Sequence, residues 1–197
     1  MAARHQREQE DAEYDFKVLL NDSLHFSNLV IMNVAWSGFS FGFFLINSYM
    51  KYIPGDIYTN VIYSSLADLF STFFAAYLSK YLGNQKALII SFFISGVFAF
   101  ALVFQPTVDD EQLSYTLLAL VILTKLGVCS ASNICSLITA EYFPVKYASS
   151  VFGFCSIAAR FTTILAPLVA EMEAPTPMLI LSAFALCTIF FVERLKK

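Results

Sequence analysis

Long stretches without any charged side chain are the feature of this sequence that most limits its fold. Three segments contain no Asp, Glu, Lys or Arg: Ser23–Met50, Ala87–Val108 and Ala174–Val192. Three further apolar segments carry a charged residue near their centre, and these are Ile57–Leu82, Gln112–Ala140 and Tyr147–Ala170. A helix needs about 20 apolar residues to cross the hydrocarbon core of a bilayer. The pattern therefore predicts membrane-spanning helices at about 28–50, 57–82, 87–105, 112–140, 147–170 and 176–192.

The composition excludes several classes of protein. Hydrophobic residues make up 58% of the 197 residues and charged residues only 14%, whereas a soluble domain has about 25% charged residues. The formal net charge of −3 provides no basic surface for phosphates. These values argue against a soluble enzyme and a nucleic-acid binder. We expect an all-α, polytopic membrane protein with the lipid bilayer as its first partner and no nucleic acid as a partner.

The expected spans are joined by short segments with turn-forming residues, such as Pro54-Gly55-Asp56 and Gly83-Asn84-Gln85. Such connections leave no room for a folded domain between the helices. We divide the chain into an N-terminal segment (1–27), a six-helix transmembrane domain (28–192) and a tail (193–197). The first 22 residues hold six acidic side chains, which is atypical of a signal or transit peptide.

Basic residues are distributed unequally between the two expected faces of the membrane. Lys and Arg in short loops mark the cytoplasmic side. One face carries only Lys51, and the other carries Arg4, Arg7, Lys17, Lys80, Lys86, Lys146, Arg194, Lys196 and Lys197. We therefore expect an integral, multi-pass protein with both termini on the cytoplasmic side or its equivalent.

Polar residues recur at intervals of three and four along four of the six expected helices, which places them on one face of each helix. The polar stripes comprise Asn33, Ser37, Ser40 and Asn47; Asn60, Ser64, Asp68 and Ser71; Lys125, Cys129, Ser132, Ser136 and Thr139; and Ser149, Gly153, Ser156, Arg160 and Thr163. The third and sixth helices lack such a stripe. The order polar, polar, apolar thus occurs twice, which is typical of the inverted three-helix repeats of secondary transporters. We expect the stripes to share one surface, with the third and sixth helices behind it.

Small residues also favour close helix packing in lipid, so the stripes alone allow a purely structural interpretation. Gly38 and Gly42 form a GxxxG pattern that fits packing better than binding. The charged residues favour function, because a charge at the centre of a span costs about 3 kcal/mol on insertion scales. Asp68, Lys125 and Arg160 each lie roughly 17–20 Å from one end of their helix, near the middle of the membrane.

Asp68 can form a structural ion pair with either Lys125 or Arg160. Either pairing leaves one positive charge over, because two cations face one acid. A cation in a cavity favours an organic anion, or the carboxylate of a zwitterion, as a small ligand. The predicted substrate-binding residues are therefore Asn33, Asp68, Lys125, Ser132, Ser156 and Arg160.

No catalytic or cofactor site is expected. Cys129, Cys135, Cys155 and Cys187 lie within expected spans and form no CxxC pair, which indicates free thiols and no metal site. The sequence has no Gly-rich phosphate loop and no nucleophile–base arrangement. We expect neither an enzyme nor a bound cofactor.

Three motifs, taken in order, carry a family resemblance. They are Gly55–Asn60 followed by Asp68; Lys125–Gly127 followed by Ile138–Pro144 (ITAEYFP); and Ser156–Pro167. They resemble the seventh-to-eighth helix region, the tenth helix with its signature K-F-G…Y-T-A-E-L-Y-P, and the eleventh helix of the organic ion (cation, anion and zwitterion) transporters. The chain thus looks like the C-terminal half of a major facilitator superfamily transporter. In that family an arginine at the position of Arg160 is typical of organic anion members, whereas cation members tend to have an acid there.

The resemblance also implies a set of gating residues, which are Gly83, Lys86, Glu141 and Lys146. In such transporters these cytoplasmic loops help to switch between inward-facing and outward-facing states. The family usually has arginines after the glycine, whereas here the loop reads Gly83-Asn84-Gln85-Lys86. The family arginine four residues after the proline falls on Ala148, with Lys146 as a substitute. The basic gate is therefore reduced.

Two functions remain open. The chain resembles one half of a transporter for organic ions, with anions or zwitterions favoured. It would then need a second six-helix half or a second copy of itself, because the family's cavity lies between two such halves. The alternative is a non-transporting structural or accessory subunit within a larger membrane complex.

Overall fold

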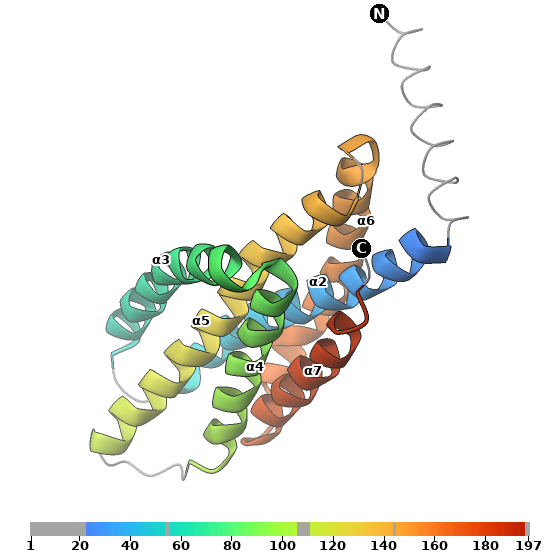
Figure 1. Cartoon of the computed structure of the whole chain (residues 1–197). Coiled ribbons are helices and arrows are strands. Elements are labelled where there is room, and N and C mark those ends of the chain that lie inside the picture. Colours follow the sequence, from blue (N-terminus) through green and yellow to red (C-terminus); the bar gives the residue numbers. More distant parts are fainter. Residues whose placement is uncertain (1–22, 54–55, 106–110, 144, 196–197) are drawn as a thin grey trace, which may run out of the picture.

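The computed structural model describes residues 23–53, 56–105, 111–143 and 145–195. Within these ranges the chain forms six α-helices, one short 3-10 helix and no strand. The elements are α2 (Ser23–Tyr49), η1 (Met50–Tyr52), α3 (Ile57–Leu82), α4 (Asn84–Val103), α5 (Glu111–Tyr142), α6 (Val145–Ala170) and α7 (Thr176–Val192). The prediction of an all-α fold with six long helices is confirmed (Figure 1).

The ends of α3 follow from local chemistry. Asp56 caps its N-terminus, because the carboxylate accepts hydrogen bonds from the backbone N–H groups of Tyr58 (3.4 Å) and Thr59 (3.3 Å). The Thr59 hydroxyl also donates to Asp56, and this bond is the main reason why the pKa of Asp56 is lowered. At the other end, Gly83 adopts φ +81°, which an L side chain rarely tolerates. Because α4 begins at the next residue, this single glycine turns the chain between two helices.

Helix α2 starts earlier than expected. It begins at Ser23 rather than at residue 28, so residues 23–27 are helical and continue directly into the first expected span. The ring of His25 lies against Phe143 beyond the end of α5, with 6.3 Å between ring centroids. This contact attaches the first turn of α2 to the rest of the bundle.

The helices pack in a pattern that repeats. Helix α2 packs mainly against α6, and α3 mainly against α5, while α4 lies against both α5 and α7 (Figure 1). The first three helices correspond in order to the last three: α2 to α5, α3 to α6 and α4 to α7. This correspondence turns the α2–α6 pair into the α5–α3 pair, and it maps the α4–α7 pair onto itself. The arrangement therefore has the internal symmetry expected of two three-helix repeats.

Two glycine contacts bring helices close together. A Cβ atom added to Gly127 of α5 would lie 2.7 Å from the backbone nitrogen of Ser95 and 2.8 Å from the carbonyl oxygen of Ser91 on α4. A Cβ added to Gly42 of α2 would lie 3.0 Å from Leu181 of α7. Gly127 thus permits a close approach of the α4 and α5 backbones, as in other membrane helices, and Gly42 leaves room for the side chains of Leu181 and Val128.

Five helices, α2 to α6, are long and apolar enough to cross a membrane, and the apolar α7 has 17 residues. The least buried of them are α3 and α6, which expose many large apolar side chains. We call the two ends of the bundle the Gly83 end and the Lys51 end. The Gly83 end contains the α3–α4 turn and the last residues of α5 and α7. The Lys51 end contains η1 and the first residues of α3, α5 and α7.

Candidate functional site

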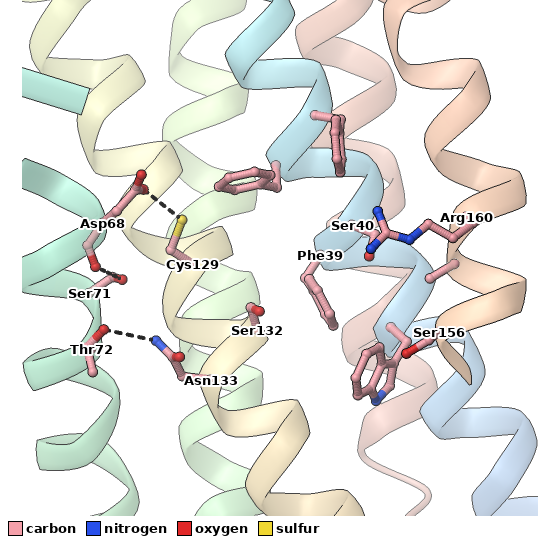
Figure 2. Close-up of a pocket in the computed structure, with 14 residues that line it drawn as sticks. Phe39, Ser40, Asp68, Ser71, Thr72, Cys129, Ser132, Asn133, Ser156 and Arg160 are labelled. Carbon is pink, nitrogen blue, oxygen red and sulfur yellow. Dashed lines mark hydrogen bonds between the residues drawn. The ribbon is translucent and has the colours of Figure 1, made fainter. Parts of the chain in front are cut away.

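A cavity of about 520 Å³ lies between α2, α3, α5 and α6. Helices α4 and α7 contribute none of its described lining residues. Both therefore lie behind the lined surface, in keeping with the predicted order of polar and apolar helices. The cavity is lined by Trp36, Phe39, Ser40, Phe43, Phe44, Asp68, Ser71, Thr72, Cys129, Ser132, Asn133, Ser156, Ala159 and Arg160 (Figure 2).

Polar pairs join α3 to α5 along one wall of the cavity. They occur at every fourth residue on both helices, which is about one helical turn. In each pair the α3 residue contacts the α5 residue 61 positions later, since the two helices run in the same direction and in register. The pairs are Ser64 with Lys125, Asp68 with Cys129 (3.1 Å) and Thr72 with Asn133 (3.4 Å).

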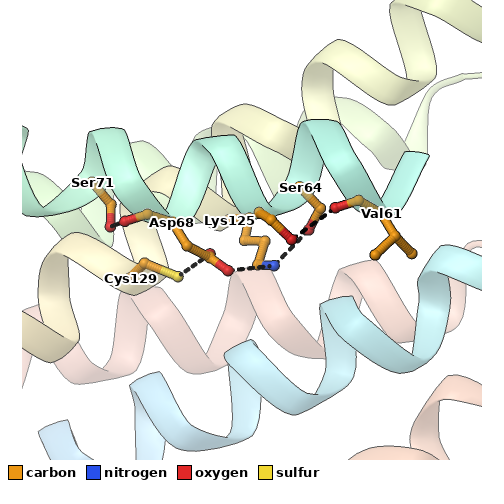
Figure 3. Close-up of polar contacts among 7 residues, drawn as sticks. Val61, Ser64, Asp68, Ser71, Lys125 and Cys129 are labelled. Carbon is orange, nitrogen blue, oxygen red and sulfur yellow. Dashed lines mark hydrogen bonds and ion pairs between the residues drawn. The ribbon is translucent and has the colours of Figure 1, made fainter. Parts of the chain in front are cut away.

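An ion pair links two of these polar pairs. The ammonium of Lys125 lies 3.0 Å from Oδ2 of Asp68, and it also donates a hydrogen bond to Ser64 (Figure 3). The Lys125 side chain is only 4% exposed, whereas that of Asp68 is 38% exposed and lines the cavity. Of the two pairings that the sequence left open, the structure contains the one between Asp68 and Lys125.

Arg160 lies on the opposite wall. Its side chain extends from α6 toward α2, across the cavity from Asp68 (Figure 2). It is exposed, and among the described residues it forms no ion pair. Since Asp68 and Lys125 neutralise one another, the cavity retains the single positive charge of Arg160.

Helix α2 supplies an aromatic surface between the two polar walls. Trp36, Phe39, Phe43 and Phe44 all line the cavity. The Trp36 indole donates a hydrogen bond to the hydroxyl of Thr139 (3.3 Å). The polar stripes did not predict these residues, although three of them recur at intervals of three and four as the stripes do.

Trp36 also separates the cavity from a smaller hollow of about 340 Å³ toward the Gly83 end. Thr139, which accepts the indole hydrogen bond, lines this second hollow. So does Phe152 of α6, whose ring meets that of Trp36 edge to face at 4.5 Å between centroids. Trp36 therefore occupies the boundary between the two spaces.

The structure brings together four of the six predicted substrate-binding residues. Asp68, Ser132, Ser156 and Arg160 line the cavity. Lys125 lies behind the wall, where it reaches Asp68 and not the cavity itself. Asn33 is half-buried about one turn before Trp36 and is outside the lining. Polar residues that the stripes omitted are Thr72 and Asn133.

The predicted gating residues lie at the Gly83 end, except that the side chain of Lys146 falls outside the part of the chain that is described. Lys86 is exposed. Glu141 accepts a hydrogen bond of 2.6 Å from the amide of Asn84, which joins the start of α4 to the end of α5. The neighbouring Gln85, which the sequence analysis did not single out, donates to carbonyl oxygens at the end of α7.

Known proteins share this sequence pattern. The family model of the Major Facilitator Superfamily matches residues 24–195. The organic cation/carnitine transporter 2 of Mus musculus is 28% identical over 173 residues, which is 84% of this chain and 30% of that protein. Solute carrier family 22 member 4 of Mus musculus is 27% identical over 157 residues, or 77% of this chain and 27% of that protein.

A third relative comes from an amphibian. The solute carrier family 22 member 15-like protein of Xenopus tropicalis is 27% identical over 136 residues, which is 68% of this chain and 28% of that protein. The chain thus spans less than a third of the length of these relatives. The family match covers almost the whole described bundle and agrees with the six-helix fold. The chain is an integral, multi-pass membrane protein that belongs to the major facilitator superfamily.

Proposed function

We propose that this chain is a half-domain of an organic-ion transporter and that its cavity binds the carboxylate of an organic anion or zwitterion through Arg160. The observation that carries this proposal is the position of Arg160, a cavity cation with no ion-pair partner among the described residues. A guanidinium can hold a carboxylate through two parallel hydrogen bonds, which suits it to this role.

The other walls suit the remainder of such a ligand. The aromatic side chains of α2 offer an apolar surface, and aromatic rings attract cationic groups as well. Three relatives are named as organic cation/carnitine transporters, and carnitine carries both a quaternary ammonium and a carboxylate. A zwitterion of this kind has the cationic group that the names of the relatives indicate, and it also has a carboxylate that matches the surplus positive charge of this cavity.

Transport requires a second wall. Transporters of this type alternate by rocking one half against the other around a central site. The four lining helices of this chain supply one wall, and the relatives are more than three times as long as the matched region. We infer that a second six-helix half, or a second copy of this chain, closes the transport path around this wall, whereas Arg160 and the aromatic residues that would hold the ligand belong to this chain.

Ligand binding to the purified full chain in mild detergent tests the proposal. Trp36 is the only tryptophan and it lines the cavity, so its fluorescence reports on this site. Butyrate and carnitine are expected to raise the thermal midpoint and to change the emission of Trp36. Arg160→Lys is expected to weaken the affinity for both ligands, as measured by either effect, at least about tenfold. Arg194→Lys is the matched control, because Arg194 stacks on Phe190 outside the cavity. Equal losses in both variants, or no ligand effect on the unmodified protein, would refute the carboxylate site.

One observation favours an accessory subunit instead. At the Gly83 end, the neutral Asn84 binds Glu141 where the family usually has an arginine. A protein with this altered gate could retain the fold without transporting. Such a protein would show no response to the carboxylates and would purify as part of a defined larger complex, whereas a transporting half would purify with one matching half or a second copy.

We propose in addition that the Gly83 end faces the cytoplasm, on the basis of the unequal distribution of basic residues. Single cysteines introduced at Lys86 and at Glu173, both exposed and at opposite ends, should react with a membrane-impermeant thiol reagent from opposite sides. Labelling of both from the same side would contradict this orientation.

A further inference from the structure

Lys125 contributes a charge to the cavity wall without lining the cavity. Its ammonium lies beneath the wall, bound to Ser64 and 3.0 Å from Asp68 (Figure 3). Only Asp68 of this pair reaches the cavity surface. The ion pair is therefore asymmetric, with a buried cation that acts on a partly exposed acid.

Both oxygens of the Asp68 carboxylate are already engaged. Oδ2 faces Lys125, and Oδ1 accepts a hydrogen bond from the Cys129 thiol at 3.1 Å. An ammonium group that enters the cavity must therefore compete with Lys125 for the same carboxylate. Lys125 has the advantage in this competition, because a tethered group is present at a high effective concentration.

We propose that Lys125 determines the charge selectivity of the cavity: it occupies Asp68 as a built-in counterion, excludes organic cations from that carboxylate, and leaves the site to ligands with a carboxylate. This inference rests on the proposed function, since it concerns the same cavity. Lys125 is a positioning residue, because it lies behind the lining and acts on ligands through the residues it contacts there: Asp68 as its ion-pair partner, and Phe43, whose ring centroid is 5.4 Å from the ammonium.

The difference in burial identifies a suitable variant. Lys125→Met keeps the length and bulk of the buried side chain and removes its charge. The carboxylate that remains is 38% exposed, so water in the cavity can hydrate it. The reverse change, Asp68→Asn, leaves the ammonium of a side chain that is only 4% exposed without its acid, and is expected to cost more stability.

The test compares two probes of similar size and opposite charge, butylammonium and butyrate, on the purified full chain. Binding is followed by the thermal midpoint and by the emission of Trp36. In Lys125→Met the affinity for butylammonium relative to butyrate is expected to rise at least about tenfold, the size of one charge-assisted contact. A merely structural ion pair would change the stability and leave this ratio unaltered.

The double variant Lys125→Met with Asp68→Asn is the control, because it removes the carboxylate that the cation would use. It is expected to lose the gain in butylammonium binding. A gain that persists in the double variant, or a ratio unchanged within about twofold in Lys125→Met, would overturn the inference. If Lys125→Met does not fold, Lys125→Gln decides, because its neutral amide can still donate hydrogen bonds to Ser64 and Asp68: the affinity for butylammonium relative to butyrate should again rise, and an unchanged ratio would overturn the inference.

The outcomes also separate this inference from the proposed function. If the unmodified protein binds butyrate and the ratio does not move, the inference fails while the carboxylate site stands. If the unmodified protein binds no butyrate but Lys125→Met binds butylammonium, the inference stands and the carboxylate site fails. If no form of the protein binds either probe, both proposals fail.

Discussion

The close contact between α4 and α5 depends on one residue without a side chain. A Cβ at Gly127 would lie 2.7 Å from the backbone nitrogen of Ser95 and 2.8 Å from the backbone oxygen of Ser91. These are backbone atoms of a packed helix, so they cannot rotate away as a flexible side chain could. We therefore expect Gly127→Ala to force α4 and α5 apart.

The magnitude follows from two opposing effects. Overpacking a well-packed region costs about 1–3 kcal/mol, whereas replacing glycine by alanine inside a helix returns up to about 1 kcal/mol. Gly153 of α6 provides a matched control, because a Cβ added there meets nothing within 4 Å. Both changes share the helical gain, so the difference between Gly127→Ala and Gly153→Ala isolates the cost of the clash, about 1–3 kcal/mol.

Reversible unfolding in mixed micelles, followed by circular dichroism, measures this difference. Gly127→Ala should unfold at a lower denaturant fraction than the unmodified protein, and Gly153→Ala at an equal or higher one. If the two variants unfold together, the α4–α5 contact is not as close as described and the reasoning fails. Ala99, a buried alanine on α4, offers a further check, because Ala99→Gly should destabilise through the lower helix propensity of glycine and the lost methyl contacts, without any overlap.

Three further outcomes are expected. Trp36→Phe removes the indole donor to Thr139 and should lower the free energy of unfolding by about 1 kcal/mol; no change would contradict the bond. Gln85→Glu cannot donate to the carbonyl groups at the end of α7 and places a negative charge there, so a loss of about 1–3 kcal/mol is expected in the same assay. The hydrogen bond from Lys51 lowers the pKa of Glu171, so its contribution to stability is present near neutral pH and is lost as the pH falls through the lowered value. The thermal midpoints of the unmodified protein and Glu171→Gln should therefore converge in acid, and a constant difference down to pH ~3 would argue against this ion pair.

The helices could be predicted because charges and turn residues interrupt the apolar sequence at few places. Asp56 and Gly83 bound α3 in the structure as they did in the sequence. The start of α4 was predicted less well, since Asn84 and Gln85 are polar and suggest a loop. They belong to the helix because their side chains bind Glu141 and the end of α7, which are distant in the sequence.

The periodicity of polar residues predicted part of the cavity lining, but it did not predict the aromatic part. A polar residue in a span has few acceptable surroundings, so Ser132 and Arg160 could be assigned to a lined surface. An aromatic residue in a span is equally suited to lipid, to the core or to a cavity. Phe39 and Phe43 therefore gave no distinct signal, although they line the cavity.

Counting charges in the sequence established that one cation had to be left over, and it could not establish which one. Lys125 and Arg160 lie at similar depths in their helices, so depth did not distinguish them. The register between α3 and α5 does, because it places Lys125 beside both Ser64 and Asp68. Ser64 and Asp68 are four residues apart on α3, and Lys125 and Cys129 are four residues apart on α5. This equal spacing is the sequence signal that could have indicated the pairing. Once that pairing is made, Arg160 remains as the cation of the cavity lining, and the proposal of a carboxylate ligand rests on how α3 and α5 face one another rather than on the number of charges.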